Sequence, residues 1–82
     1  MKVGDSFTIN PTVVAAIERA FGPIYCDRFA TAANAVCSRF NTYFYEPGTS
    51  GVDAFAQDDW DAGLNWVHPP LSLIDRTLLF LQ

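Results

Sequence analysis

Residues 64–71 have the sequence Leu64-Asn65-Trp66-Val67-His68-Pro69-Pro70-Leu71. The first four residues are apolar except for Asn65, and such a short run bounded by breakers is typical of a buried strand. The strand must end at the two prolines, because proline has no N–H to donate to a sheet. Open α/β sheets bind ligands beyond the carboxyl ends of their strands, so this corner is predicted to lie where a site would form.

A second buried strand is predicted nearer the N-terminus. Ile24-Tyr25-Cys26 is short and apolar, follows Gly22-Pro23, and ends at Asp27. A carboxylate directly after a buried strand occupies the same kind of position as the Pro-Pro corner. Its alternative interpretations are pairing with Arg28 or Arg39, or capping of the next turn.

Helices are predicted at both ends of the chain. Asn10-Pro11 is a strong helix start, with asparagine as the N-cap and proline in the first turn. Apolar residues then recur at helical spacing up to Gly22-Pro23, which stops the helix. A final helix is predicted from Leu73 to the end of the chain, with Ser72 as its candidate cap.

The middle of the chain is less regular. Residues 28–38 are rich in alanine and predict a loop with a helical turn that Asn34 could cap, and Phe40–Tyr45 predicts an aromatic strand. After a turn cluster at residues 46–51, Val52–Phe55 is compatible with a short strand or a helical turn. The order predicts an α/β fold, a small three- to four-stranded sheet with flanking helices, in a single domain over residues 1–82. Because Gln82 lies inside the last helical pattern, we expect an excised or truncated domain.

Composition limits the classes of partner. The 82 residues are 50% hydrophobic, carry a net charge of −4, and contain five scattered basic residues, which disfavours a basic nucleic-acid-binding face. No apolar run approaches the roughly 20 residues of a membrane span, and no secretion signal is visible. We therefore expect no membrane partner and an intracellular location, in the cytoplasm or the nucleus.

The chain has two cysteines and one histidine, Cys26, Cys37 and His68. A structural zinc site needs about four such ligands, so no metal site is expected. Two free thiols are favoured over a disulfide for an intracellular protein.

Short motifs spread over nearly the whole chain occur in one order. They are Asp5-Ser6-Phe7-Thr8-Ile9-Asn10-Pro11, Phe21-Gly22-Pro23, Asp27-Arg28-Phe29-Ala30, Asn34, Arg39-Phe40-Asn41, Pro47-Gly48, Asp53-Ala54-Phe55, Asp59-Trp60, Asn65-Trp66, Pro69-Pro70 and Leu73-Ile74. Together they resemble a segment of DIRS-like, tyrosine-recombinase retroelement polyproteins, located just downstream of the reverse transcriptase and RNase H domains. The resemblance implies neighbouring polyprotein domains, or another protein, as partners.

That segment is in turn similar to phage-type DNA-adenine methyltransferases, through Asn34-Ala35-Val36-Cys37-Ser38-Arg39-Phe40 and the Trp-x-x-Pro-Pro corner. This looser resemblance implies a truncated, Rossmann-like layer. It also implies that Asp27, Asn34 and possibly Asp59 line the side of the cofactor S-adenosylmethionine. His68-Pro69-Pro70-Leu71 would then form the corner that holds the target base.

The corner departs from the family pattern at both chemical contacts. In that family an asparagine carbonyl and a proline carbonyl accept the N–H bonds of the adenine amine, and an aromatic ring stacks on the flipped base. Here His68 replaces the asparagine and Leu71 replaces the ring, and leucine cannot stack. The chain also ends one helix after the corner, without the remaining strands of a methyltransferase sheet. We therefore do not expect the isolated chain to be an enzyme. If it is a methyltransferase, the catalytic candidates are His68, Pro69 and Pro70.

Three other chemistries have weaker signals. The acidic run Asp53, Asp58, Asp59 and Asp61 would suit two-metal nuclease chemistry, but clustered aspartates in one turn usually form a solvated, helix-capping loop. Cys37 with His68 imitates a thiol nucleophile and its base, without an identifiable third residue. Trp60 and Trp66 could stack on bases, although a buried core role suits a chain of this charge better.

Three functions remain open from the sequence. The leading interpretation is a non-catalytic structural or interaction domain of a retroelement-type polyprotein, a degenerate relative of the methyltransferases that needs no cofactor. The alternatives are a fragment of an S-adenosylmethionine-dependent DNA-adenine methyltransferase and a nucleic-acid-binding accessory domain of a reverse transcriptase.

Overall fold

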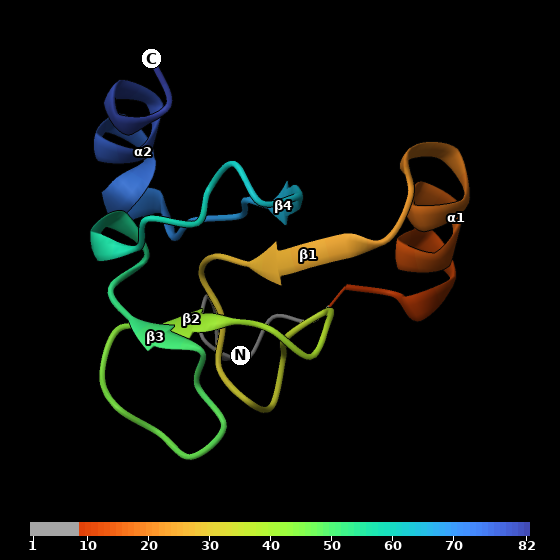
Figure 1. Cartoon of the computed structure of the whole chain (residues 1–82), viewed down its shortest axis with the longest axis horizontal. Coiled ribbons are helices and arrows are strands. Elements are labelled where there is room, and N and C mark those ends of the chain that lie inside the picture. Colours follow the sequence, from red (N-terminus) through yellow and green to blue (C-terminus); the bar gives the residue numbers. More distant parts are fainter. Residues whose placement is uncertain (1–8) are drawn as a thin grey trace.

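The framework consists of two short pairs of parallel strands (Figure 1). In the computed structural model, which describes residues 9–82, β1 (Ile24–Asp27) pairs with β4 (Leu64–Trp66), and β2 (Asn41–Thr42) pairs with β3 (Gly51–Val52). A single parallel bridge between Asp27 and Phe40 connects the two pairs. The motif Asp5-Ser6-Phe7-Thr8 lies outside the described residues.

Both predicted strands form and pair with each other, but only β1 is mostly buried; β4 has one exposed and two partly buried residues, so its predicted burial is wrong. Ile24 lies opposite Leu64 and Asp27 lies opposite Trp66, with an irregularity between Ile24 and Cys26. The chain is thus a small mixed α/β domain with two short parallel sheets and two helices. The four strands do not join in one sheet of regular ladders, and the methyltransferase-like layer stays a prediction.

Helix α1 (Pro11–Phe21) begins and ends as its sequence indicates. The Asn10 side chain accepts a hydrogen bond from the N–H of Thr12 at 2.8 Å, and Pro11 occupies the first turn. The helix ends at Gly22, whose φ of 94° lies in the left-handed region that glycine adopts without strain. Val14 is the only residue of α1 that is buried, and the helix forms a separate lobe at the right of Figure 1.

The aromatic strand predicted over Phe40–Tyr45 is mostly wrong, because only Asn41–Thr42 forms a strand and Phe40 adds a single bridge to Asp27. The Thr42 hydroxyl hydrogen bonds to the Phe44 carbonyl at 2.7 Å and to the Thr49 hydroxyl at 3.0 Å, which closes residues 43–50 into a loop. Local side-chain bonds of this kind compete with a ladder. The segment Val52–Phe55 contains both predicted options, the end of β3 and the start of a 3-10 turn, η1 (Ala54–Ala56).

The C-terminal helix is confirmed, but its cap is not. A 3-10 turn, η2 (Leu71–Leu73), leads into α2 (Ile74–Phe80). Ser72 lies within that turn, and the N-cap position is Leu73 without a side-chain hydrogen bond. Instead, Thr77 donates to the Leu73 carbonyl at 2.7 Å from inside the helix. None of the helices within residues 9–82 has the length and apolar character required to cross a membrane.

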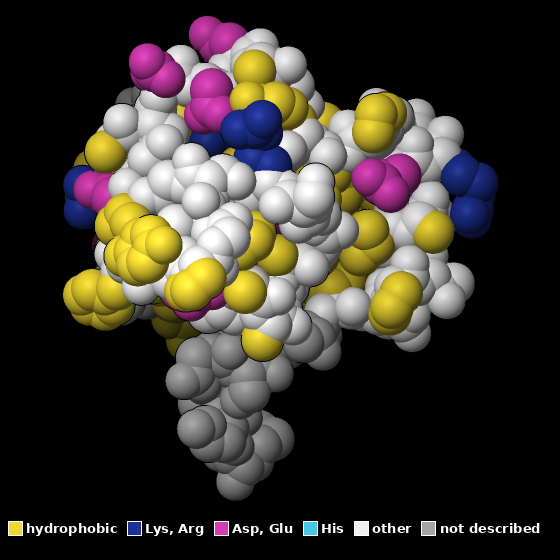
Figure 2. Space-filling view, turned by 60° about the horizontal axis from the view of Figure 1, so that its bottom comes forward, with side chains coloured by type: hydrophobic (Ala, Val, Ile, Leu, Met, Phe, Trp, Pro, Cys, Tyr) yellow, Lys and Arg dark blue, Asp and Glu magenta, His cyan; other side chains and the backbone are white. Residues whose placement is uncertain are grey.

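The buried interior is small and unusually polar. Its apolar members are Val14, Ile24, Cys26, Ala30, Phe40 and Ala54, and its polar members are Asp27, Arg28, Asn41, Thr42 and Thr77. Trp66, predicted to be buried, is only partly covered. Many large apolar side chains remain exposed instead, and Figure 2 shows hydrophobic groups spread over the visible face.

Candidate functional site

The carboxyl ends of β1 and β4 bring together two residues that the sequence marked as a site. Asp27 ends β1 beside Trp66, and His68-Pro69-Pro70 follows β4 after Val67. Asp27 is buried, and its Oδ2 atom accepts a hydrogen bond from the Val36 N–H at 3.1 Å. Its Oδ1 atom has no hydrogen-bond partner in the part of the chain that the structure describes. His68 is exposed and lines, with Ile9, Trp66 and Val67, a hollow of about 350 Å³.

Burial sets the charge state of this carboxyl group. It raises the pKa of Asp27 above its ordinary value, because the charged form loses its hydration. The backbone N–H groups of Val36 and Phe29 and the nearby His68 oppose this rise and leave a net upward shift. Asp27 pairs with neither Arg28 nor Arg39, because the ion pair within residues 9–82 is Arg28 with Asp59.

The other two predicted cofactor residues have structural partners. The Asn34 side chain accepts a hydrogen bond from the Thr31 N–H at 2.8 Å, so Asn34 caps the turn that carries Val36 to Asp27. Asp59 belongs to a separate network, in which it binds Arg28 and Tyr25. The structure therefore brings Asp27 and His68 to one edge and engages Asp59 elsewhere.

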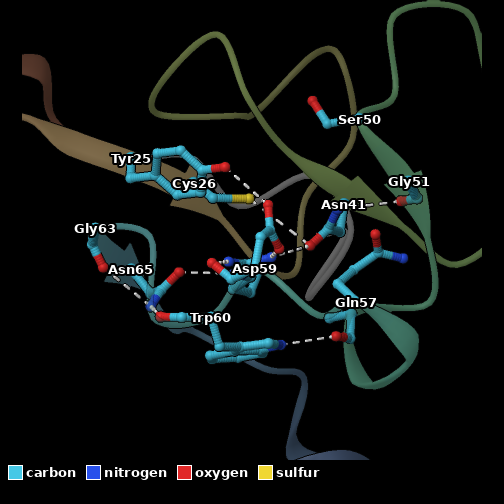
Figure 3. A network of polar contacts seen from close by, with 12 residues as sticks. Tyr25, Cys26, Asn41, Ser50, Gly51, Gln57, Asp59, Trp60, Gly63 and Asn65 are labelled. Carbon is cyan, nitrogen blue, oxygen red and sulfur yellow. Dashed lines mark hydrogen bonds and ion pairs between the residues drawn. The ribbon is translucent and has the colours of Figure 1, made fainter.

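Arg28 is the centre of that network, although no sequence motif identified it as such. Its guanidinium donates from Nε to Asn65 Oδ1 at 2.7 Å, from Nη1 to Asn41 Oδ1 at 3.0 Å, and from Nη1 to Asp59 Oδ1 at 2.8 Å. Nη2 donates to the Asp59 carbonyl at 3.1 Å. The side chain is fully buried. Figure 3 shows the partners Asn41, Asp59 and Asn65 converging from three different segments.

Aromatic rings complete the enclosure of Arg28. Its guanidinium carbon lies 4.5 Å from the centroid of Trp60 and 6.0 Å from that of Tyr25. The Tyr25 hydroxyl donates to Asp59 Oδ2 at 2.9 Å, and the Trp60 indole N–H donates to the Ala54 carbonyl at 2.9 Å. A buried arginine is tolerated only when it is paired and its donors find acceptors, and its four hydrogen bonds meet that condition here.

The network also shifts the pKa values of its acids. The hydrogen bond from Arg28 holds the pKa of the Asp59 carboxyl below its usual range, and the bond to Asp59 raises the pKa of the Tyr25 hydroxyl. Both shifts fix one proton arrangement, in which Asp59 is ionised and Tyr25 is neutral. Such an arrangement stabilises a structure and does not supply a titrating acid or base near neutral pH.

Two asparagines in the sequence could have indicated this network. Asn41 and Asn65 interrupt segments that are otherwise β-prone, and both are needed as acceptors for Arg28. A buried amide requires a partner, so two asparagines within predicted strands indicate a third polar group between them. The nearby arginine after β1 was the available candidate.

The cysteines and acids do not form a reactive centre. Both cysteines are free, as predicted, and burial raises the pKa of Cys26 to about 11 and also raises that of Cys37. Burial thus disfavours the thiolate that nucleophilic chemistry with His68 would need. Among the described residues, no three or more His, Cys, Asp or Glu side chains are placed to hold a metal ion.

Replacing Asp27 by asparagine is expected to stabilise the domain at pH 7. The raised pKa means that ionised Asp27 costs folding free energy above its folded pKa, and that this cost disappears below its unfolded pKa of about 3.9. The substituted amide would keep an oxygen for the Val36 N–H without the charge. The advantage of Asp27→Asn over the wild type should shrink as the pH falls through this window.

Urea denaturation at pH 7 and at pH 4 measures this difference, with the exposed Asp58→Asn as the matched control. A variant that is less stable than the wild type at pH 7, with no change on acidification, would contradict the assignment of Asp27 as a destabilising buried charge.

Comparison of the chain with protein-family models, curated proteins and solved structures finds no match. The ordered motifs therefore remain a resemblance.

Proposed function

We propose that this chain is a non-catalytic structural or interaction domain of a retroelement-type polyprotein, with a degenerate methyltransferase-like fold. The observation that carries the proposal is the exposed apolar surface. Ile74 and Leu78 on α2 and Leu81 at its C-cap follow each other at helical spacing and are exposed, whereas Thr77 is buried. Leu71, in the 3-10 turn that precedes α2, is also 88% exposed. Soluble monomers rarely leave large contiguous apolar patches uncovered, so this surface suits contact with another protein.

The loop after β2 presents a second apolar surface. Phe44 and Tyr45 are 84% and 77% exposed, although the loop is held by the hydrogen bonds of Thr42 and by a bond from the Thr49 N–H to the Glu46 carbonyl. Aromatic side chains on a fixed loop lose little conformational entropy on binding, which favours protein contacts.

The charges favour a protein partner over nucleic acid. Arg19, Arg39 and Arg76 are exposed but lie on three different segments, and Arg28 is neutralised by Asp59. A net charge of −4 opposes binding to phosphate backbones. The resemblance names the reverse transcriptase and RNase H domains as the neighbours that such a surface would contact.

The test is association with the purified reverse transcriptase–RNase H unit of a DIRS-like polyprotein, followed by fluorescence anisotropy of the labelled chain. Leu78→Glu should weaken the association at least about tenfold, as expected for a hot-spot residue. Ala16→Glu, at an exposed position of α1, adds the same charge and should leave it unchanged. No association of the wild type, or an equal effect of both variants, would overturn the proposal.

A methyltransferase fragment is the second candidate, and one observation favours it. β1 and β4 are adjacent and parallel, so Asp27 and the His68-Pro69-Pro70 corner meet at the carboxyl edge of the same strand pair. This is the edge at which α/β folds bind ligands. Asp27 and Asn34 would then face the cofactor, and His68 would face the base.

We expect no methyl transfer to DNA by this chain. His68 stands where the family has its asparagine, and Leu71 stands where it has its aromatic ring. Loss of such a polar contact typically lowers a rate by about 10²–10³-fold. A radiolabelled transfer assay measures this, beside calorimetric titration with S-adenosylmethionine. Label in DNA that disappears in Pro70→Ala would establish the enzyme, and binding without transfer would identify a relic of the cofactor site.

A further inference from the structure

A hollow of about 620 Å³ lies at the end of the β1–β4 pair opposite to the Pro-Pro corner. Ile24, the first residue of β1, and Gly63, which directly precedes β4, form part of its wall. Tyr25, Ser38, Arg39 and Ser50 supply its functional groups. Its volume lies within the range of small-molecule sites, about 300–1,000 Å³.

Arg39 is held in place at the rim of this hollow without a carboxylate partner. Its guanidinium carbon lies 4.7 Å from the centroid of the Tyr25 ring, and the Tyr25 hydroxyl is itself fixed by Asp59. The Arg39 carbonyl accepts a hydrogen bond from the Asp27 N–H at 3.0 Å, which fixes the backbone. Within residues 9–82 the ion pair belongs to Arg28 and Asp59, so the charge of Arg39 is uncompensated there.

Ser50 provides an oriented hydroxyl on another part of the wall. Its Oγ atom accepts a hydrogen bond from the Phe40 N–H at 3.1 Å, and its own N–H donates to the Phe40 carbonyl at 2.8 Å. Because Oγ is already used as an acceptor, its proton remains to donate to a ligand. Figure 3 shows Ser50, Tyr25 and Gly63 around the network that holds this wall.

Gly63 allows the chain to lie close to Tyr25 at the rim. A Cβ atom at this position would lie 2.6 Å from the Tyr25 Cβ, so only glycine allows the backbone to pack against Tyr25. The Tyr25 ring that carries Arg39 is thereby held from both its hydroxyl and its Cβ end.

We propose that this hollow binds the carboxylate of a small organic acid or of a peptide C-terminus, with Arg39 as the charged contact and the Ser38 and Ser50 hydroxyls as donors. The planar guanidinium fork matches a carboxylate with two parallel hydrogen bonds. One cation in a chain of net charge −4 compensates a single negative charge, which favours a carboxylate over a phosphate dianion. The site lies apart from α2 and does not depend on the proposed interaction role.

Nuclear magnetic resonance titration of the full chain tests the proposal, with benzoate and a hexapeptide with a free C-terminal carboxylate as probes. We expect saturable shifts of the Arg39 side-chain and Ser50 amide signals. Arg39→Ala should weaken binding about tenfold or more, as expected for a lost charge-assisted hydrogen bond. Arg39→Lys keeps the charge but not the fork and should bind between the two. Arg19→Ala, an exposed arginine of α1, should bind as the wild type does.

The two probes separate the sources of the carboxylate. Tighter binding of benzoate indicates a small acid, and tighter binding of the hexapeptide, but not of its C-terminal amide, indicates a peptide. Two results would overturn the proposal. One is that inorganic phosphate at pH 8 binds more tightly than either probe, and the other is that the probes bind Arg39→Ala as tightly as the wild type. Thermal melting of each variant, and Arg39→Gln as a second substitution, separate lost binding from lost folding.

Discussion

Arg28→Ala is expected to leave much of the protein unfolded at 25 °C. The substitution removes four hydrogen bonds and leaves Asn41, Asn65 and the Asp59 carboxylate without their partner. Breaking a buried ion pair by removing one member costs about 3–5 kcal/mol. The whole free energy of unfolding of a small domain is about 5–15 kcal/mol, so this loss is a large fraction of it. Urea denaturation followed by circular dichroism measures the change.

Two further variants separate the causes of this loss. Arg28→Lys keeps the charge but cannot reach three segments with one planar fork, so we expect an intermediate loss of stability. Arg19→Ala removes an exposed arginine and should change stability by less than about 0.5 kcal/mol. An Arg28→Ala protein that melts within about 4 °C of the wild type, equivalent to roughly 1 kcal/mol or less, would show that the network contributes little.

Trp60→Ala is expected to cost about 3 kcal/mol, the lower end of the range for a large aromatic side chain, because the ring is partly exposed. The indole covers the Arg28 guanidinium and lies 5.0 Å from the centroid of Phe80, which also contacts Phe55 at 5.2 Å. Trp60 thereby connects the polar network to α2. We expect α2 to lose protection in hydrogen exchange before the strands do.

Trp60→Phe keeps most of the ring but loses the hydrogen bond to the Ala54 carbonyl. It should cost about 1 kcal/mol, the usual net contribution of such a bond. Trp66→Ala serves as the matched control, since both tryptophans are partly buried. A loss at Trp66 that exceeds the loss at Trp60 would instead favour the sequence-based expectation that Trp66 is a buried core residue.

The polar network and the exposed apolar surface are consistent with one another. A domain whose interior contains an arginine, an aspartate and three amide or hydroxyl side chains buries few large apolar groups, and the leucines of α2 remain outside. Specificity of the fold then comes from directional bonds around Arg28, and the apolar side chains that stay exposed are those that the proposed partner would cover.

Capping residues, glycine and short apolar runs in the sequence predicted those helices and strands that depend mainly on neighbouring residues. Asn10-Pro11 and Gly22 placed both ends of α1, because capping and backbone freedom depend on neighbouring residues alone. The apolar runs at Ile24 and Leu64 also placed β1 and β4, although β4 ends at Trp66, before Val67 and the two prolines that were expected to stop it. Phe40–Tyr45 was predicted as one strand because its β propensity is high, but the bonds of the Thr42 hydroxyl overrode that propensity.

In the candidate site, too, some residues could be placed from local sequence signals and others could not. Asp27 and His68 lie at the same carboxyl edge, since each lies at or just beyond the end of one of two parallel strands, and their role as a site stays a prediction. Asp59 could not be assigned from its position in an acidic loop, because its role depends on an arginine 31 residues away.

By itself the sequence determined both ends of α1, the positions of the two principal strands, the free cysteines and the position of the Pro-Pro corner. Only the tertiary structure decided that Arg28 is the centre of the interior, because its acceptors on Asn41, Asp59 and Asn65 lie 13, 31 and 37 residues away. Burial of a charge becomes favourable only after these segments have converged, so no local pattern predicts it. The tertiary structure likewise decided that Arg39, eleven residues further along the chain, forms no ion pair with a carboxylate of residues 9–82.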